Sequence, residues 1–211
     1  MSSLPTLPSE YFAREDESPD ELFYAHPCLT AHVDPDALAS ITALYDRYLC
    51  GGRAVLDVMS SCVSHLPREH GFARVAGLGL NAAELAANPQ LTERVVQNVN
   101  VCPTLPWASG TFDAALLALS VQYATRPVEL FAEIGRVLQP GAPLIVTFSH
   151  RCVSSKAVAV WRALDDGGHA ALVEHYFEDA GPFGDREVID CRPRRRCGDP
   201  VYAVIGRTLR D

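Results

Sequence analysis

Three side chains that could move a proton or orient a substrate lie a few residues beyond apolar, β-branched runs of the sequence. They are His65, Tyr123 and His150. Imidazole and phenol groups are common general acids and bases in enzymes, so these three residues are candidates for catalysis. Capping and packing are the alternative roles, because an isolated histidine carries no mechanism of its own.

Three cysteines occupy similar places in the sequence. Cys62, Cys102 and Cys152 follow the first, third and fifth of the predicted strands, with His65 and His150 nearby. Thiols and imidazoles are ligands of thiophilic metals, so a metal or metalloid site is one interpretation. The other is that cysteine is a small residue often buried for packing alone. The chain has no Cys-x-x-Cys pair of the kind that binds structural zinc.

The elements that must position these residues are strands separated by helices. Apolar runs predict strands over residues 54–58, 74–80, 111–120, 144–149, 187–191 and 201–207, and a short third strand with its exit loop over 93–100. Apolar spacing and capping residues predict helices over 35–49, from 82 onward, over 127–138 and over 156–177, the last with a break at Gly167-Gly168. We also expect a helix after the loop that follows the first strand. Strands that alternate with helices predict an α/β sheet whose parallel strands end at one edge, where the residues after them should converge.

Three segments carry a resemblance to a known family. Val55-Leu56-Asp57-Val58 resembles the first strand of class I S-adenosylmethionine-dependent methyltransferases, which ends in an acidic residue. Residues 111–120 resemble the Ser-Phe-Asp-x-Val strand of that family, and residues 133–142 resemble its Glu-x-x-Arg-Val-Leu-Lys-Pro-Gly-Gly segment. The resemblance, to type 11 methyltransferases, implies a doubly wound, mostly parallel seven-stranded α/β sheet with an antiparallel C-terminal strand pair.

The same resemblance implies how the chain is organised. Residues 53–211 would form the methyltransferase-like α/β domain, and residues 1–52 an N-terminal tail and a helical cap or lid. Segments of this kind often lie over the active site in the family. Tyr24, His26 and His32 are therefore candidates for closing the site, with ordinary packing as the alternative.

The resemblance also implies a cofactor, S-adenosylmethionine, and methyl transfer to a small-molecule acceptor. His65, Tyr123 and His150 remain the catalytic candidates, and no metal ligand is assigned. The residues that the resemblance places at the cofactor are Asp57, Met59, Ser60, Ser61, Cys62, Gly79, Leu80, Asn81, Asn98, Val99, Ser120 and Val121.

The loop after the first strand departs from the family pattern. The family has Gly-x-Gly-x-Gly, whereas this chain has Met59-Ser60-Ser61-Cys62-Val63. Glycine serves such loops because it lacks Cβ and reaches positive φ. Serine is the next smallest choice here, so we expect a reshaped cofactor pocket.

A second departure concerns the acid that binds the ribose in the family. Gly79 occupies that position, while Glu84 lies one turn further on and Asn81 could offer one weaker bond besides capping the helix. Asn98, or alternatively Asn100, replaces the aspartate that contacts adenine. These departures leave an alternative function open: a methyltransferase-fold protein that has lost the donor site and binds another ligand or acts non-catalytically.

Composition and charge argue against several classes of protein. The 211 residues, 48% of them hydrophobic, suit a domain with a sizeable core. A net charge of -8 argues against nucleic acid as a partner, and no apolar run approaches the roughly 18–20 residues of a membrane span. Seven scattered cysteines and no export signal favour a cytoplasmic location. The arginines between the last two strands, at 192 and 194–196, predict a solvated hairpin loop, or else a contact for an anion or a partner.

Overall fold

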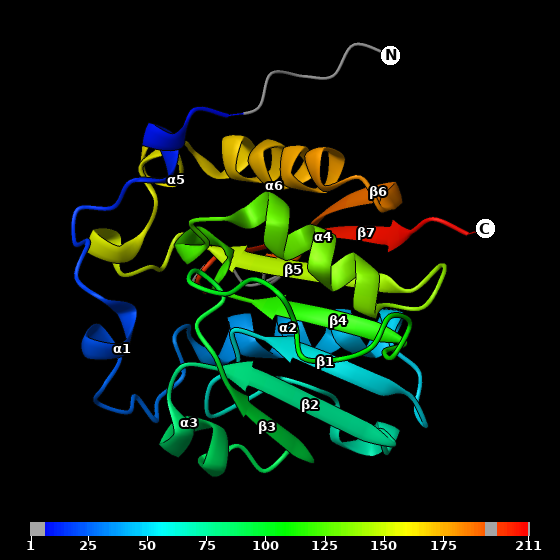
Figure 1. Ribbon diagram of the computed structural model, residues 1–211. Helices are drawn as coiled ribbons and strands as arrows, with labels where there is room; N and C mark the ends of the chain where they lie inside the picture. The colour runs from blue at the N-terminus through cyan, green and yellow to red at the C-terminus, as the bar shows by residue number, and fades with distance from the viewer. Residues whose placement is uncertain (1–6, 193–197, 211) are drawn as a thin grey trace.

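Seven strands form one sheet in the computed structural model, which describes residues 7–192 and 198–210. The strands are β1 (Ala54–Val58), β2 (Arg74–Gly79), β3 (Glu93–Val96), β4 (Ala114–Ala118), β5 (Pro143–Ser149), β6 (Phe183–Asp190) and β7 (Val201–Thr208). Their order across the sheet is β3-β2-β1-β4-β5-β7-β6 (Figure 1). The first five strands are parallel, and β7 runs antiparallel to both β5 and β6. The predicted mostly parallel α/β sheet with an antiparallel C-terminal pair is confirmed.

Helices and short helical turns connect the strands and cover the sheet. The α-helices are α1 (Asp20–Phe23), α2 (Pro35–Tyr48), α3 (Ala82–Ala87), α4 (Pro127–Val137), α5 (Ala159–Ala163) and α6 (Asp166–Ala180). The 3-10 turns are η1 (Ser9–Phe12), η2 (Arg68–His70), η3 (Val121–Tyr123) and η4 (Ser154–Lys156). No helix of the described residues is long and apolar enough to cross a membrane.

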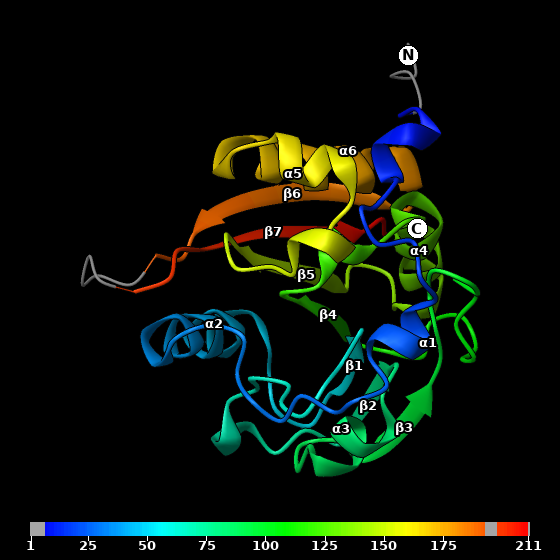
Figure 2. The same ribbon diagram turned by 90° about the vertical axis from the view of Figure 1, so that its left-hand side faces the viewer.

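Two apolar cores flank the sheet. On one face α2 buries Ala37, Ile41 and Tyr45 against strand residues that include Val55 and Ile145. On the other face α4 and α6 form the larger core, and Figure 2 shows them on the side opposite α2. Helix α2 is thus part of the layered domain, although it lies within residues 1–52.

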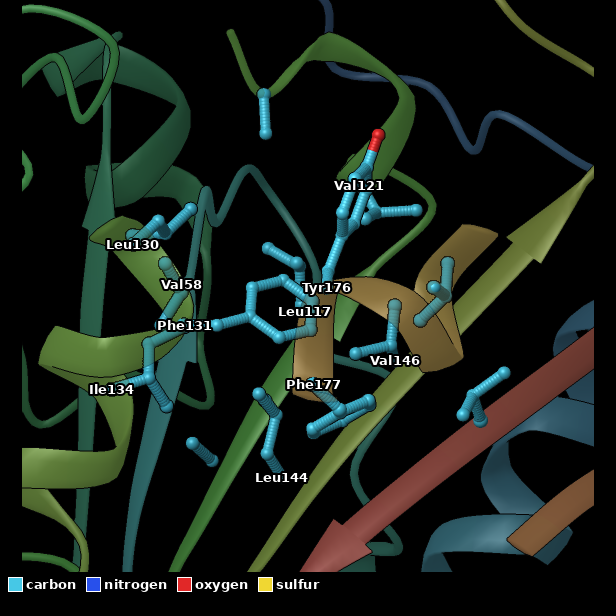
Figure 3. Close-up of a cluster of buried hydrophobic side chains, with 14 of the residues drawn as sticks. Val58, Leu117, Val121, Leu130, Phe131, Ile134, Leu144, Val146, Tyr176 and Phe177 are labelled. Atoms are coloured by element: carbon cyan, nitrogen blue, oxygen red, sulfur yellow. The ribbon is translucent and has the colours of Figure 1, made fainter. Parts of the chain in front are cut away.

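The larger core is closely packed around aromatic rings. Phe131 of α4 packs against Tyr176 and Phe177 of α6, with ring centroids 5.9 and 4.8 Å apart (Figure 3). Leu117 and Val146 of the sheet lie in the same cluster and are fully buried. Burial of such side chains stabilises the domain by about 1.5–3 kcal/mol each.

The helix expected after β1 is absent. The described residues between β1 and β2 form only the 3-10 turn η2. Pro67 disfavours a helical conformation at Leu66, and Met59 and His65 both have positive φ, of 54° and 56°. These features prevent a regular helix in the segment.

The helix predicted over 156–177 is divided, but not at the glycine pair. Helix α5 ends at Ala163, and α6 begins at Asp166. The Asp165 side chain accepts a hydrogen bond from the Gly168 backbone N–H and caps α6. Gly167-Gly168 therefore lie in the first turn of α6. The arginines at 194–196 lie outside the described residues.

Candidate functional site

A cavity of about 320 Å³ lies at the carboxyl ends of the parallel strands. Its walls are residues 59–61 after β1, 79–81 after β2 and 97–100 after β3, together with Ser120 and Tyr123 after β4. Strand exits meet here because parallel strands end at the same edge of the sheet. The volume is within the usual range for a small-molecule site.

Most of the residues predicted to contact a cofactor line this main cavity. Nine of the twelve do so: Met59, Ser60, Ser61, Gly79, Leu80, Asn81, Asn98, Val99 and Ser120. Asp57 and Cys62 line a smaller neighbouring cavity of about 70 Å³ instead. Val121 is buried in the larger core.

A segment of the N-terminal region, residues 14–32, closes the main cavity from outside, and we call it the strap. Its residues in the cavity wall are Arg14, Asp20, Phe23, Tyr24, His26, Cys28 and His32. The three residues predicted to close the site, Tyr24, His26 and His32, are among them. The strap contains α1 and passes across the carboxyl ends of the parallel strands (Figure 2).

Buried charges hold the first half of the strap. Asp20 is 4% exposed, and its carboxylate lies 2.6 Å from Arg14 Nη1 and 3.6 Å from Lys156 Nζ. Lys156 is fully buried and donates to the Ser18 carbonyl oxygen at 2.6 Å. A buried charge without its partner is strongly destabilising, so these ion pairs fix the strap against the segment after β5.

The amide of Asn81 holds the second half of the strap. Its Oδ1 accepts from the backbone N–H groups of Ala83 and Glu84, which caps α3 as predicted. Its Nδ2 donates to the carbonyl oxygens of Tyr24 and Ala25. The whole amide is therefore engaged by protein groups.

The two asparagines after β3 also bind the strap. Asn98 Nδ2 donates to Glu21 Oε1 at 2.8 Å, and Asn98 Oδ1 accepts from the Asn100 N–H. Asn100 Nδ2 donates to Asp20 Oδ2 at 3.0 Å and to the Tyr123 carbonyl oxygen. Both side chains line the cavity, but their amides face protein partners.

Gly79 is a position where no side chain fits. A Cβ there would lie 2.1 Å from the Ser60 carbonyl oxygen. The loop after β1 and the end of β2 are held this close by a hydrogen bond of 2.8 Å from the Ser60 N–H to the Leu78 carbonyl oxygen. The loop after β1 thus occupies the space that a ribose-binding acid at residue 79 would need.

The smaller cavity is lined by a buried carboxylate, Asp57, and a partly buried imidazole, His65. Asp57 is 2% exposed, and within the described part of the chain no basic side chain forms an ion pair with it. Burial raises its pKa to about 6, although bonds from Ser60 and Ser64 oppose the rise. Burial, with the nearby His32, lowers the pKa of His65 to about 4. His65 is therefore neutral at pH 7.

Backbone strain concentrates at the same small cavity. Among the described residues, the non-glycine positions with positive φ are Met59, His65 and Leu119, and all three line it. Such conformations cost about 1–3 kcal/mol each and cluster at functional sites. The strain supports a functional role for the edge of the sheet at β1 and β4.

Two hydroxyl groups of the main cavity lack hydrogen-bond partners. Tyr24 Oη and Ser120 Oγ are buried and have no partner among the described residues. Buried polar groups are normally satisfied, so a ligand is the natural partner for both. Tyr123 differs, because its Oη accepts a bond of 2.8 Å from the Val153 N–H.

The three catalytic candidates lie in different places. Tyr123 lines the main cavity, and His65 lines the smaller one. His150 lines a separate open hollow with Cys152, and its Nε2 lies 3.6 Å from Asp199. The structure does not bring the three together around one point.

The cysteines after the strands do not converge either. Cys102 and Cys152 are exposed, whereas Cys62 is partly buried. Within residues 7–192 and 198–210, no three His, Cys, Asp or Glu residues are grouped so that they could hold a metal ion. The thiol-rich metal site therefore has no support from the geometry.

Sequence reasoning missed three residues of the site and named a fourth, Glu84, without its role. Arg14, Asp20 and Lys156 hold the strap, and Glu84 joins it to the loop after β1. The contacts of Lys156 and Glu84 span long sequence separations, so no local pattern marks them. The unusual position of an acid one turn beyond Gly79 was the one available signal for Glu84.

Comparison with known proteins shows what the chain resembles. Residues 58–146 match the family described as "Methyltransferase domain". The protein "Methyltransferase phqN" of Penicillium fellutanum is 30% identical in a match 154 residues long that covers 64% of this chain and 46% of that protein. The chain therefore spans about half the length of this relative.

Solved structures share the fold at low sequence identity. The [4+2]-cyclase SpnF has a TM-score of 0.59 at 17% identity, with 81% of each chain covered. A SAM-dependent methyltransferase from Aquifex aeolicus has a TM-score of 0.59 at 17% identity, covering 83% of this chain and 94% of its own. One from Mesorhizobium loti has a TM-score of 0.59 at 16% identity, covering 80% and 97%.

Proposed function

Because the chain has the class I methyltransferase fold and matches a methyltransferase domain over its central segment, we propose that it transfers a methyl group from S-adenosylmethionine to a small-molecule acceptor. One observation carries the proposal. The exits of β1, β2, β3 and β4 wall a single cavity of about 320 Å³, and nine of the twelve residues predicted for the cofactor line it. This is the edge at which open α/β sheets bind their ligands.

The lining suits an adenosyl sulfonium compound in three respects. Leu80 and Val99 offer apolar surface for an adenine ring. Tyr24 and Ser120 offer hydroxyls that have no hydrogen-bond partner among the described residues, and these can bind polar groups of the ligand. Asp57 lies behind the loop as a buried carboxylate that pairs with no basic side chain of the described residues, and a positively charged ligand is favoured near such a group. When bound, S-adenosylmethionine would supply an activated methyl group.

The residues of the chain would act mainly by orientation and by exclusion of water. The strap covers the cavity, and a closed site strengthens polar interactions inside it. Burial raises the pKa of Tyr123, so its phenol is protonated at neutral pH and can donate to an acceptor while it accepts from Val153. Holding donor and acceptor in line is a large contribution that a protein can make to such a transfer.

His65 would serve a different purpose from Tyr123. Its lowered pKa leaves the imidazole neutral at pH 7, so one ring nitrogen can accept a proton or a hydrogen bond. It lines the small cavity, which shares His32, Ser60 and Ser120 with the main one. We propose that it orients a polar group of the acceptor there.

A second candidate function is favoured by the polar groups of the cavity that already bond to other parts of the protein. The Ser60 carbonyl oxygen blocks an acid at residue 79, and the amides of Asn81 and Asn98 bind the strap. A protein with this fold could therefore bind another ligand or catalyse another reaction. SpnF, named a [4+2]-cyclase, shares the fold, and fold alone does not determine function.

The free cysteines of the described residues support a proposal for the cellular location. All six cysteines of the described residues are free, which suits a reducing compartment, and we propose the cytoplasm.

Calorimetric titration with S-adenosylmethionine and with S-adenosylhomocysteine separates the two functions. The proposal expects a dissociation constant in the micromolar range, about -8 kcal/mol. The variant Gly79→Ala should lose this binding, because its Cβ would displace the Ser60 carbonyl oxygen. The matched control is Gly167→Ala, where the nearest atom to a Cβ is the Asp165 side chain at an ordinary 3.6 Å.

No binding of either compound to the folded wild-type protein would overturn the methyltransferase proposal and favour the second candidate. Circular dichroism of each variant provides the check that it is folded. If the protein binds the donor, incubation with methyl-labelled S-adenosylmethionine and pooled small-molecule acceptors then tests transfer.

A further inference from the structure

The loop after β1, residues 59–65, lacks the usual means of holding its shape, and we call it the serine loop. It contains no glycine, and within the described residues no α-helix follows it before β2. Met59 and His65, at its two ends, have positive φ, which non-glycine residues rarely adopt. Groups outside the loop must therefore stabilise its conformation.

Two side chains from α3 and its C-terminal cap reach the serine loop. Glu84 and Asn88 are four residues apart, a spacing that places side chains on one face of a helix. Glu84 Oε2 accepts from Ser61 Oγ at 2.6 Å. Asn88 is fully buried, and its Nδ2 donates to the Ser61 carbonyl oxygen at 3.0 Å and to Ser64 Oγ at 2.9 Å.

The side chain of Ser60 is held from the opposite side. Its Oγ donates to Asp57 Oδ2 at 2.6 Å, and Ser64 Oγ donates to the same oxygen at 2.6 Å. Consecutive serines are thus bound to two different carboxylates, Ser60 to Asp57 and Ser61 to Glu84. Neither hydroxyl is free to turn into the cavity, although both residues line it.

The Glu84 carboxylate also reaches the strap. Its Oε1 accepts from the Cys28 backbone N–H at 2.7 Å. One side chain therefore connects α3, the serine loop and the strap, which are three walls of the main cavity. A hydrogen bond to a charged acceptor contributes more to stability than a hydrogen bond between neutral groups.

We propose that Glu84 and Asn88 are positioning residues that hold the serine loop and the strap in the shape required for ligand binding. Here α3, which follows β2, provides the support that glycines and a following helix do not provide. The binding part of this proposal rests on the proposed function. The conformational part can be tested without any ligand.

Hydrogen–deuterium exchange of the ligand-free protein tests the conformational part. In Glu84→Ala and Ser61→Ala, backbone amides of residues 60–64 should exchange about 10-fold faster, which corresponds to about 1.4 kcal/mol. Glu84→Gln keeps an acceptor oxygen and should recover part of the protection. Glu69→Gln and Ser109→Ala change exposed residues of the same types and should leave the loop unchanged.

A double-mutant cycle with S-adenosylmethionine tests the binding part. Each of Ser61→Ala and Glu84→Ala should weaken binding about 10-fold, and the double variant should be no weaker than about 10- to 20-fold. If the losses of affinity in the two single variants instead multiply in the double variant, Glu84 contacts the ligand directly, and the positioning role is overturned.

The two proposals fail in distinguishable ways. Unchanged exchange in Glu84→Ala and Ser61→Ala would overturn the role of Glu84, whatever the protein binds. Absence of S-adenosylmethionine binding to the wild-type protein would overturn the proposed function, and faster loop exchange in the variants would still support the role of α3 in shaping the cavity.

Discussion

The segment from β4 to β5 and the segment from β1 to α3 belong to the same sheet but are stabilised in different ways. In the first, residues such as Leu116, Phe131 and Ile134 are fully buried and apolar. In the second, Asp57 and Asn88 are as deeply buried, and polar. The first segment fits the family pattern closely, whereas the second departs from it in its glycines, its acid and its helix.

Positive φ at non-glycine residues marks the carboxyl edge of both segments. In the first segment Gly141 takes a φ of 78° at the turn before β5, where glycine adopts it without strain, and Leu119 takes 53° directly after β4. In the second, Met59 and His65 take such values, and the serines between them are held by hydrogen bonds to Asp57, Glu84 and Asn88. An apolar scaffold thus carries a strained polar edge, as is common where structure has been adapted to function.

The largest change in the free energy of unfolding is expected from a substitution in the apolar segment. Phe131→Ala would remove a fully buried ring that packs against Tyr176 and Phe177. The free energy of unfolding should fall by about 3–5 kcal/mol. Urea denaturation measures the change. The variant should still bind S-adenosylmethionine where it remains folded, and a loss of binding without a loss of stability would break the division between scaffold and site.

The polar segment should show an unusual dependence of stability on pH. The pKa of Asp57 is raised to about 6, so its contribution is fully present below its unfolded pKa near 4 and is lost as the pH rises to about 6. The pKa of His65 is lowered to about 4, so its contribution is present above about 6.5 and is lost as the pH falls to about 4. The two trends oppose each other between pH 4 and 6.

Single variants should separate these trends. Asp57→Asn should raise the free energy of unfolding by about 2–3 kcal/mol at pH 7 and leave it nearly unchanged at pH 4. His65→Gln should leave a profile that falls as the pH rises from 4 to 6. Thermal unfolding across this range provides the measurement. An equal gain for Asp57→Asn at both pH values would contradict the buried, uncompensated carboxylate.

The smallest effect is expected at an unpartnered hydroxyl. Ser120→Ala removes Ser120 Oγ, which has no hydrogen-bond partner among the described residues. Stability should change by less than about 0.5 kcal/mol, while affinity for S-adenosylmethionine should fall about 3- to 10-fold. Denaturation and calorimetry on the same sample give both values. A clear loss of stability would assign the hydroxyl to the scaffold.

The central strands β4 and β5 could be predicted from sequence because their residues are mainly apolar and buried. Burial on both faces requires this of runs such as 114–118 and 143–149, and no distant residue alters it. The topology of a parallel sheet alone predicts that the strands end at one shared edge. That is why most of the predicted cofactor residues, for example Leu80 and Val99, line one cavity.

The polar supports could not be predicted, since they depend on partners far along the chain. Lys156 reaches Ser18 across 138 residues, and Glu84 reaches Cys28 across 56. A lysine or a glutamate at such positions normally indicates only a solvated surface. The absence of a helix after β1 differs from the prediction, because residues 59–66 contain no proline or glycine to mark it, and Pro67 and Gly71 come only later in the segment.

Hydrogen–deuterium exchange of the wild-type protein with and without S-adenosylmethionine tests most directly whether the donor binds at the polar edge. We expect slower exchange in the serine loop, in residues 79–84 and in the strap, with no change in the hairpin of β6 and β7. Protection that omits the serine loop and the strap would contradict it, and would place the donor elsewhere on the molecule.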